Sequence, residues 1–461
     1  MTLILVLAII VHTATAAVYS FEVHFFSPFD WLLLSAADGI LLVAALTNRH
    51  LFTTRNFRLP GVAIVSLFAL ILIPLPMVTN LYESLLPRTM LVSIAAGIVA
   101  MSLVFLVPNK ATKERLWADR EFVSERYFII LILVFALFVM VLWVRSMSSI
   151  PIVEVIKGSS DAEGITSSRQ RALSDLDSVG IRTSVGILRN LYLIFTSAWL
   201  VSDYLATTHS TLKSRLANQT WVVSGLLVSL VFAVLTTEKA IIIEVSIACF
   251  VAASVSTDKR VSLRASFLMA SSVVFPILVL TRGAKADVFD ALNGLGRRIF
   301  FLPSDVMAKY FAAFPADHPF LLGASIPKSS FLTGGETFDL SRYIYIRFYQ
   351  RDIGVIGNAN GSFIGVGWAN FGAIGVVLWC VFLAIALVLL DRIIDGLPFR
   401  SSAAMRGLAV ISTILLTSAD IFRTVIGFVP GVLDIVLFLL ILVLVENRRL
   451  LNLRMKPKHL G

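Results

Sequence analysis

The chain has 461 residues, of which 57% are hydrophobic and only 15% are charged, and it carries a formal net charge of +10. Soluble globular chains are about a quarter charged, so this composition excludes an ordinary soluble protein and indicates a chain that lies in a bilayer. The two cysteines lie in apolar runs and the six histidines are scattered, so we predict no disulfide framework, no metal site and no cofactor.

About twelve apolar windows follow one another along the chain. A span needs roughly 20 apolar residues, and backbone polar groups in lipid must be satisfied within one segment, so each window predicts a transmembrane helix. The first window lacks the basic residues that begin a signal peptide, and we interpret it as a span. We predict an all-α, polytopic integral membrane protein with a single membrane domain over residues 1–461 and spans near residues 2–19, 31–47, 61–79, 89–107, 127–144, 185–204, 221–236, 240–256, 265–281, 363–390, 407–421 and 429–446.

The basic residues predict how these spans are oriented. If the even-numbered connections and the C-terminal tail are cytoplasmic, the short loops on that side hold about 21 Lys and Arg, against only Arg88, Lys239 and Arg423 in the short loops opposite. This asymmetry predicts that both termini are cytoplasmic. It also explains much of the net charge as a topology signal, so we predict no nucleic-acid partner.

Two long outer loops, 145–184 and 282–362, hold the other basic residues and are exempt from the charge rule. Arg182 and Arg189 lie where the chain leaves the first loop and returns to the membrane. In the second loop, Arg297 and Arg298 precede a predicted helix, which we expect Ser304 or Asp305 to cap. Arginines in this position favour an anionic substrate that is bound by bidentate guanidinium contacts. The alternative is that they pair with loop carboxylates or lipid phosphates.

Several ionisable residues lie at or near membrane depth, where they are costly and are candidates for function. Glu238 and Lys239 lie in a predicted tight hairpin between the windows at 221–236 and 240–256. The alternative interpretation is mutual neutralisation, which suits Asp420 and Arg423, three positions apart on one helical face, better than the adjacent Glu238 and Lys239. The other members of this set are Glu244, Arg282, Asp420 and Arg423.

The segment 357–379 combines polar and small residues where the chain returns to the membrane. Asn358, Asn360 and Asn370 supply hydrogen-bonding groups, and five glycines between 361 and 375 allow close backbone approach. From the residues alone this is either a polar binding segment or a helix-packing seam.

The order Asn-x-Asn-x-x-Phe-Ile-Gly-x-x-x-x-Asn-Phe-Gly-x-x-Gly-Val in this segment resembles the O-antigen polymerase (Wzy-type) family of bacterial inner membranes. The likeness extends to the Thr-x-Glu-Lys hairpin at 236–239 and the segment 297–311. It implies a fold similar to the GT-C-like fold of lipid-linked-oligosaccharide polymerases and ligases. The implied substrate is an undecaprenyl-diphosphate-linked oligosaccharide on the outer leaflet, whose glycan is transferred to an acceptor sugar hydroxyl.

This resemblance gives the polar residues expected roles in a metal-independent glycosyltransferase. The leaving lipid diphosphate is already a stable anion, so the protein must supply positive charge and orientation. We expect a general base among His318 and Glu238, with Asp305 a third candidate. The resemblance leaves room for a chain-length regulator as a partner. The substrate-binding candidates are Arg182, Arg189, Arg282, Arg297, Arg298, Lys239, Tyr310, Asn358, Asn360 and Asn370.

Three alternative functions remain open from the sequence. A flippase or other transporter of the lipid-linked oligosaccharide is one, although transporters more often have internal repeats and short loops. A transferase that uses a polyprenyl-monophosphate sugar is the second, and it lacks the expected acidic pair, because residues 21–30 offer only the separated Glu22 and Asp30. An O-antigen ligase-like transferase, with a similar mechanism, is the third.

Overall fold

The structure is a computed structural model that describes residues 9–14, 26–47, 57–107, 123–146, 184–206, 212–235, 239–257, 293–294, 296–326, 337–350, 357–397 and 399–416. These residues form helices, turns and short connections and include no strand, which confirms the predicted all-helical class. The similarity to a GT-C-like fold stays a prediction.

The helices have the following bounds. They are α2 (Pro28–Thr47), α3 (Leu59–Leu67), η2 (Phe68–Leu72), α4 (Leu75–Leu81), η3 (Glu83–Leu85), α5 (Met90–Leu106), α6 (Val123–Ser146), η4 (Leu188–Tyr192), α10 (Leu193–Ala206), α11 (Leu212–Leu235), α12 (Lys239–Ser256), η5 (Arg297–Phe301), α15 (Leu302–Ala313), α17 (Leu340–Phe348), α18 (Phe363–Asp395) and α19 (Phe399–Leu415).

Within the described ranges, four helical segments are long and apolar enough to cross a membrane, namely Pro28–Thr47, Leu59–Leu81, Arg126–Ser146 and Phe363–Asp395. Four shorter apolar helices lie on further predicted windows: Met90–Leu106, Leu193–Ala206, Gln219–Phe232 and Ile241–Ser256. These segments support a membrane protein. The windows at 265–281 and 429–446 lie outside the described residues, so the number of spans and their orientation stay predictions.

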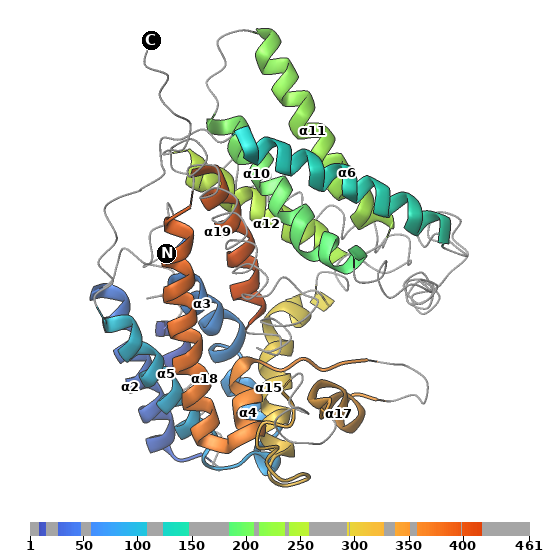
Figure 1. Cartoon of the computed structure of the whole chain (residues 1–461). Coiled ribbons are helices and arrows are strands. Elements are labelled where there is room, and N and C mark those ends of the chain that lie inside the picture. Colours follow the sequence, from blue (N-terminus) through green and yellow to red (C-terminus); the bar gives the residue numbers. More distant parts are fainter. Residues whose placement is uncertain are drawn as a thin grey trace, which may run out of the picture.

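The helices form two groups that are joined by α19 (Figure 1). Helices α2, α3, α5, α15 and α18 pack together in one group, and α6, α10, α11 and α12 pack in the other. Helix α19 contacts α3 and α18 on one side and α10 and α12 on the other. Gly407 of α19 lies against the backbone of Ala248 in α12, where a methyl group would come within 2.6 Å of the Ala248 oxygen. The two groups are therefore held in close contact through one helix.

The predicted tight hairpin around residue 238 lies between α11 and α12. Helices α11 and α12 pack against each other, and residues 236–238 between them lie outside the described part of the chain. The apolar parts of these two helices, Gln219–Phe232 and Ile241–Ser256, lie on the predicted windows 221–236 and 240–256.

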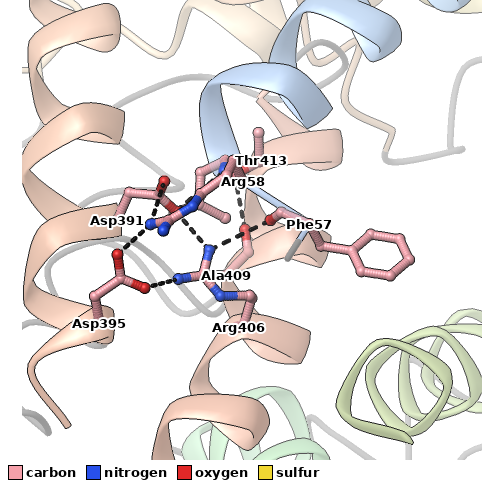
Figure 2. A network of polar contacts seen from close by, with 8 residues as sticks. Phe57, Arg58, Asp391, Asp395, Arg406, Ala409 and Thr413 are labelled. Carbon is pink, nitrogen blue, oxygen red and sulfur yellow. Dashed lines mark hydrogen bonds and ion pairs between the residues drawn. The ribbon is translucent and has the colours of Figure 1, made fainter. Parts of the chain in front are cut away.

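A network of two arginines and two aspartates joins α3, α18 and α19 (Figure 2). Arg406 of α19 donates from Nη1 to Asp391 Oδ1 at 2.6 Å and from Nη2 to Asp395 Oδ1 at 2.8 Å. Arg58, just before α3, donates to Asp395 and, at 3.3 Å, to Asp391 Oδ2. Leu59 N also donates to Asp391 Oδ1 at 3.2 Å. The side chains of Asp391 and Arg406 are 0% and 2% exposed, so the network is part of the core.

A second ion-pair site links α6, α10 and α19. Asp203 of α10 is fully buried and accepts from Arg400 Nε at 2.9 Å and from Arg126 at 3.3 Å. Arg58, Arg126, Arg400 and Arg406 all belong to the short-loop cations that predicted the orientation. The structure therefore shows that these residues also fix helices to one another.

We expect Arg406→Met to lower the free energy of unfolding by about 3 kcal/mol, because it leaves the buried Asp391 with fewer compensating charges. Arg58 and Leu59 still bond Asp391, which places the effect at the lower end for broken buried pairs. Thermal unfolding in detergent measures the change. Arg145→Met, at an exposed arginine at the end of α6, is the control. Equal melting temperatures for the two variants would contradict this role.

Candidate functional site

Helix α18 is broken near its start, and the break shapes the whole polar segment. Phe371 and Gly372 have non-helical backbone angles, and Gly372 has φ +61°. Next to the break, Gly367 and Gly375 are so close that a methyl group on Gly375 would overlap the Gly367 backbone oxygen. The short first segment of α18 therefore lies against the start of the long one. This geometry confirms that the glycines permit close backbone approach.

Asn370 lies at the end of the short segment and is fully buried. Its side-chain oxygen accepts from Gly323 N at 3.1 Å, and its side-chain nitrogen donates to Ser325 Oγ at 2.8 Å and to Val366 O at 2.9 Å. The backbone oxygen of Asn370 also accepts from Leu322 N at 3.0 Å. Asn370 thus holds the turn around Gly323, which comes after α15 in the chain, against the short segment of α18. Its predicted contact with substrate stays a prediction.

Tyr310 of α15 holds the other end of the polar segment. Its hydroxyl donates to Ala359 O at 3.0 Å and accepts from Gly361 N at 3.1 Å, and the residue is 1% exposed. A methyl group on Gly361 would come within 2.6 Å of the Tyr310 ring. Glycine is therefore required where the backbone crosses this ring. The effect is to set the position of Asn358 and Asn360, which flank Ala359.

These restraints form one wall of a cavity of about 280 Å³. The polar lining consists of Asn358 and Asn360, Arg298 from η5, and the half-buried Tyr345 and Tyr349 from α17 and its C-terminal end. The apolar lining is Leu302, Pro303, Val306 and Ala359. The two tyrosine rings are nearly parallel, with centroids 6.4 Å apart and planes 16° apart. The structure therefore brings together three of the predicted substrate-binding residues, Arg298, Asn358 and Asn360, from separate parts of the sequence.

The arginine side of this cavity lies beside a candidate span. The η5 segment packs against η2, which occupies the middle of the apolar segment Leu59–Leu81. Arg297 and Arg298 are both exposed there, and the Arg297 guanidinium lies 5.8 Å from the Phe301 ring centroid. Charged side chains at membrane depth are costly unless they face protein or a wet cavity, and they often mark a binding site.

A buried acid–base cluster next to the cavity was not predicted as a unit. Asp305 Oδ2 accepts from Lys309 Nζ at 2.8 Å and from the Tyr349 hydroxyl at 2.6 Å. The Lys309 ammonium lies 3.8 Å from the Tyr349 ring centroid and 5.2 Å from that of Tyr82. The spacing of Asp305 and Lys309, one helical turn apart, is a sequence signal for such a pair. Nothing local in the sequence indicates that Tyr349 joins them.

Burial and these contacts shift the ionisation of the cluster. Burial lowers the pKa of Lys309, and the nearby Asp305 carboxylate opposes that shift. Burial, together with interaction with Asp305, raises the pKa of Tyr82 to about 12. The same two causes raise the pKa of Tyr349. Both phenols therefore keep their protons at neutral pH.

The prediction that Ser304 or Asp305 caps this helix is wrong. Helix α15 begins at Leu302, its N-cap residue is Phe301, and no side chain caps it. The physical reason is that η5 runs directly into α15 with helical backbone angles at Phe301, so there is no free helix end for a cap to satisfy.

His318 lies at the far end of α15 from the cavity. Its Nδ1 is 2.7 Å from Pro319 O, and its ring packs among Phe314, Phe338 and Tyr343. The first residues of α15 line the cavity, whereas His318 follows the last turn of this helix, which is about 18 Å long, and does not line the cavity. The structure does not bring His318 to Arg298, and its role as a base stays a prediction.

The other predicted site residues are described only in part or not at all. Arg189 lies in η4 and Lys239 begins α12, but their side chains are outside the described part. Glu244 lies within α12. Arg182, Glu238, Arg282, Asp420 and Arg423 lie outside the described residues.

One buried ionisable pair in the first two windows was missed. His12 Nδ1 lies 2.5 Å from Asp38 Oδ2, and both side chains are fully buried. Each residue lies in an apolar window, where one polar side chain hardly lowers the mean hydropathy that defines the window.

Comparisons with models of known protein families, with curated proteins and with solved structures find no match to this chain. Within the described residues, there is no group of three or more His, Cys, Asp or Glu that could hold a metal ion.

We expect Gly375→Ala to destabilise the protein and to displace the short segment of α18, because the added methyl group overlaps the Gly367 oxygen. Gly39→Ala in α2 is the matched control, since a methyl group there meets no atom within 4 Å. That control should be neutral or raise stability by up to about 1 kcal/mol. Thermal unfolding in detergent compares the two variants. An unchanged melting temperature in Gly375→Ala would contradict the close contact.

Proposed function

We propose that this chain transfers glycan from undecaprenyl diphosphate to an acceptor sugar hydroxyl on the outer face of the bacterial inner membrane, and so polymerises lipid-linked oligosaccharide repeat units. The observation that carries the proposal is the cavity lined by Arg298, Asn358 and Asn360, with Tyr345 and Tyr349 on its wall. The resemblance of the segment 357–376 to O-antigen polymerases supports it independently.

The lining of the cavity suits a sugar next to a diphosphate. A guanidinium group such as that of Arg298 binds phosphate oxygens in pairs. Carboxamides such as those of Asn358 and Asn360 both donate and accept hydrogen bonds, as sugar hydroxyls require. A volume of about 280 Å³ lies just below the usual range for drug-sized ligands, so the cavity suits a single sugar ring better than a longer glycan.

The charge around the cavity suits the leaving group. Arg297, Arg298 and Lys309 provide three cations close to the cavity, and Asp305 neutralises one of them. An excess of positive charge stabilises the lipid diphosphate as the bond to the sugar breaks.

The break in α18 does not favour the transporter alternative. Transporters have helices broken near the bilayer midplane. Here the break at Phe371 and Gly372 is followed by roughly 23 helical residues, which are enough to cross a bilayer unbroken. The break therefore lies at one end of a span. A ligase would use the same cavity chemistry, and no separate observation favours it.

We expect the purified chain to lengthen a lipid-diphosphate oligosaccharide in repeat-unit steps without added divalent metal. Arg298→Ala and Asn360→Ala should each reduce the rate by about 100-fold or more, as loss of a group that stabilises developing charge or orients substrate does. Arg145→Ala, at an exposed arginine at the end of α6, is the matched control and should keep the wild-type rate. Gel separation of the products shows the repeat-unit ladder.

Two results would overturn the proposal. If the labelled lipid crosses the bilayer of a proteoliposome and no chain grows, the protein is a transporter. If Arg298→Ala and Asn360→Ala elongate glycan as fast as Arg145→Ala, the reaction does not take place in this cavity.

A further inference from the structure

Tyr349 belongs to the cavity and to the buried acid–base cluster at the same time. It lines the cavity beside Asn358 and Asn360. Its hydroxyl also donates to Asp305 Oδ2 at 2.6 Å. Tyr349 therefore connects the cavity to a carboxylate that is itself only 5% exposed.

Asp305 accepts hydrogen bonds from both Lys309 and Tyr349. The Lys309 ammonium donates to the same carboxylate oxygen, Oδ2, at 2.8 Å and forms an ion pair with it. Burial and the neighbouring Asp305 raise the pKa of Tyr349, so its phenol does not lose a proton on its own. A phenol that donates one hydrogen bond still has lone pairs that can accept another. Tyr349 can thus accept a proton from the cavity only while it passes its own proton to Asp305.

We propose that Tyr349 relays the proton of the acceptor hydroxyl to Asp305 during glycan transfer. This inference rests on the proposed function. The acceptor oxygen forms a bond to the anomeric carbon, and the bond from that carbon to the diphosphate oxygen breaks, with its electron pair leaving on the lipid diphosphate. The hydroxyl proton moves to Tyr349 Oη, and the Tyr349 proton moves to Asp305, which becomes a neutral carboxylic acid.

The relay couples transfer of the proton to Asp305 with departure of the negatively charged diphosphate. Before transfer, Asp305 neutralises Lys309. After transfer, Asp305 is neutral and the Lys309 charge is no longer balanced, so the cluster gains one unit of positive charge while the diphosphate leaves. A positive charge that appears with the anion stabilises the product side of the step. Tyr82, whose ring centroid lies 5.2 Å from the Lys309 ammonium, helps to enclose that charge.

A purely structural role is the main alternative for this cluster. Asp305 and Lys309 lie on α15, Tyr349 follows α17 and Tyr82 follows α4, so the contacts also hold three elements together. A structural role predicts loss of stability and of substrate binding together. A relay predicts loss of turnover with binding retained.

The test measures elongation by the full-length protein in nanodiscs, with kcat, KM and the solvent deuterium isotope effect determined separately. Tyr349→Phe keeps the ring and removes only the hydroxyl. We expect kcat to fall by about 100-fold or more, as for loss of a group that transfers a proton, with KM unchanged. The solvent isotope effect of the wild type should shrink or disappear in the variant. Tyr343→Phe, the same change on α17 and outside the cavity lining, is the control and should keep the wild-type values.

A double replacement tests the proton acceptor without leaving a buried charge unpaired. Asp305→Asn with Lys309→Met removes both members of the pair, which costs less stability than removing one. We expect this protein to fold, to bind lipid-diphosphate oligosaccharide as the wild type does, and to lose turnover to the same extent as Tyr349→Phe.

The outcomes separate the two proposals. If the wild type elongates glycan and Tyr349→Phe matches it in kcat and isotope effect, the relay is wrong and the proposed function stands. If Tyr349→Phe raises KM and lowers the melting temperature with kcat retained, the cluster is structural and the relay is again wrong. If the wild type binds the lipid but elongates nothing, the proposed function fails and the relay fails with it.

Discussion

The backbone contact between Gly367 and Gly375 determines where the polar residues of this chain can lie. Without it, the helix that begins at Phe363 would run straight, and residues 357–370 would extend away from α15. Because the contact leaves no room for a side chain on Gly375, the short segment turns back along the long one. Asn370 then bonds the turn at Gly323, and Tyr310 bonds the backbone on either side of Asn360. The cavity is the space that these restraints leave beside Arg298.

The polar chemistry of the chain is divided between the two ends of α18. The cavity lies near its first residues, and the Arg58, Asp391, Asp395 and Arg406 network lies near its last ones. The network, in which Asp391 and Arg406 are buried, ties the last turns of α18 to α19 and to the start of α3.

Much of the helical framework could be predicted from hydrophobicity, because spans in lipid must be continuous apolar segments. Asn358, Asn360 and Arg298 were predicted as binding residues from composition and from a family resemblance, and they meet in one cavity. What could not be predicted is which distant elements meet. Tyr349 joins Asp305 only through the packing of α17 on α15. An asparagine such as Asn370 can bind a ligand or fix a turn, and its sequence neighbours do not distinguish the two. The expected cap at Ser304 or Asp305 failed because a continuous helical backbone before Leu302 is not visible in residue types.

The short-loop arginines have a structural role that their positions in the sequence do not reveal. A basic residue at a cytoplasmic helix end serves the topology rule whether or not it has a partner. Arg406 and Arg400 have aspartate partners on other helices, and only the three-dimensional arrangement reveals them.

The central claim is that the cavity beside Arg298 holds the sugar next to the lipid diphosphate. An electron cryomicroscopy structure of the chain with a lipid-diphosphate oligosaccharide tests it most directly. The account predicts density for the diphosphate against Arg298 and for the adjoining sugar between Tyr349 and Asn360. Density for the diphosphate at a different place on the protein, with this cavity empty, would contradict it.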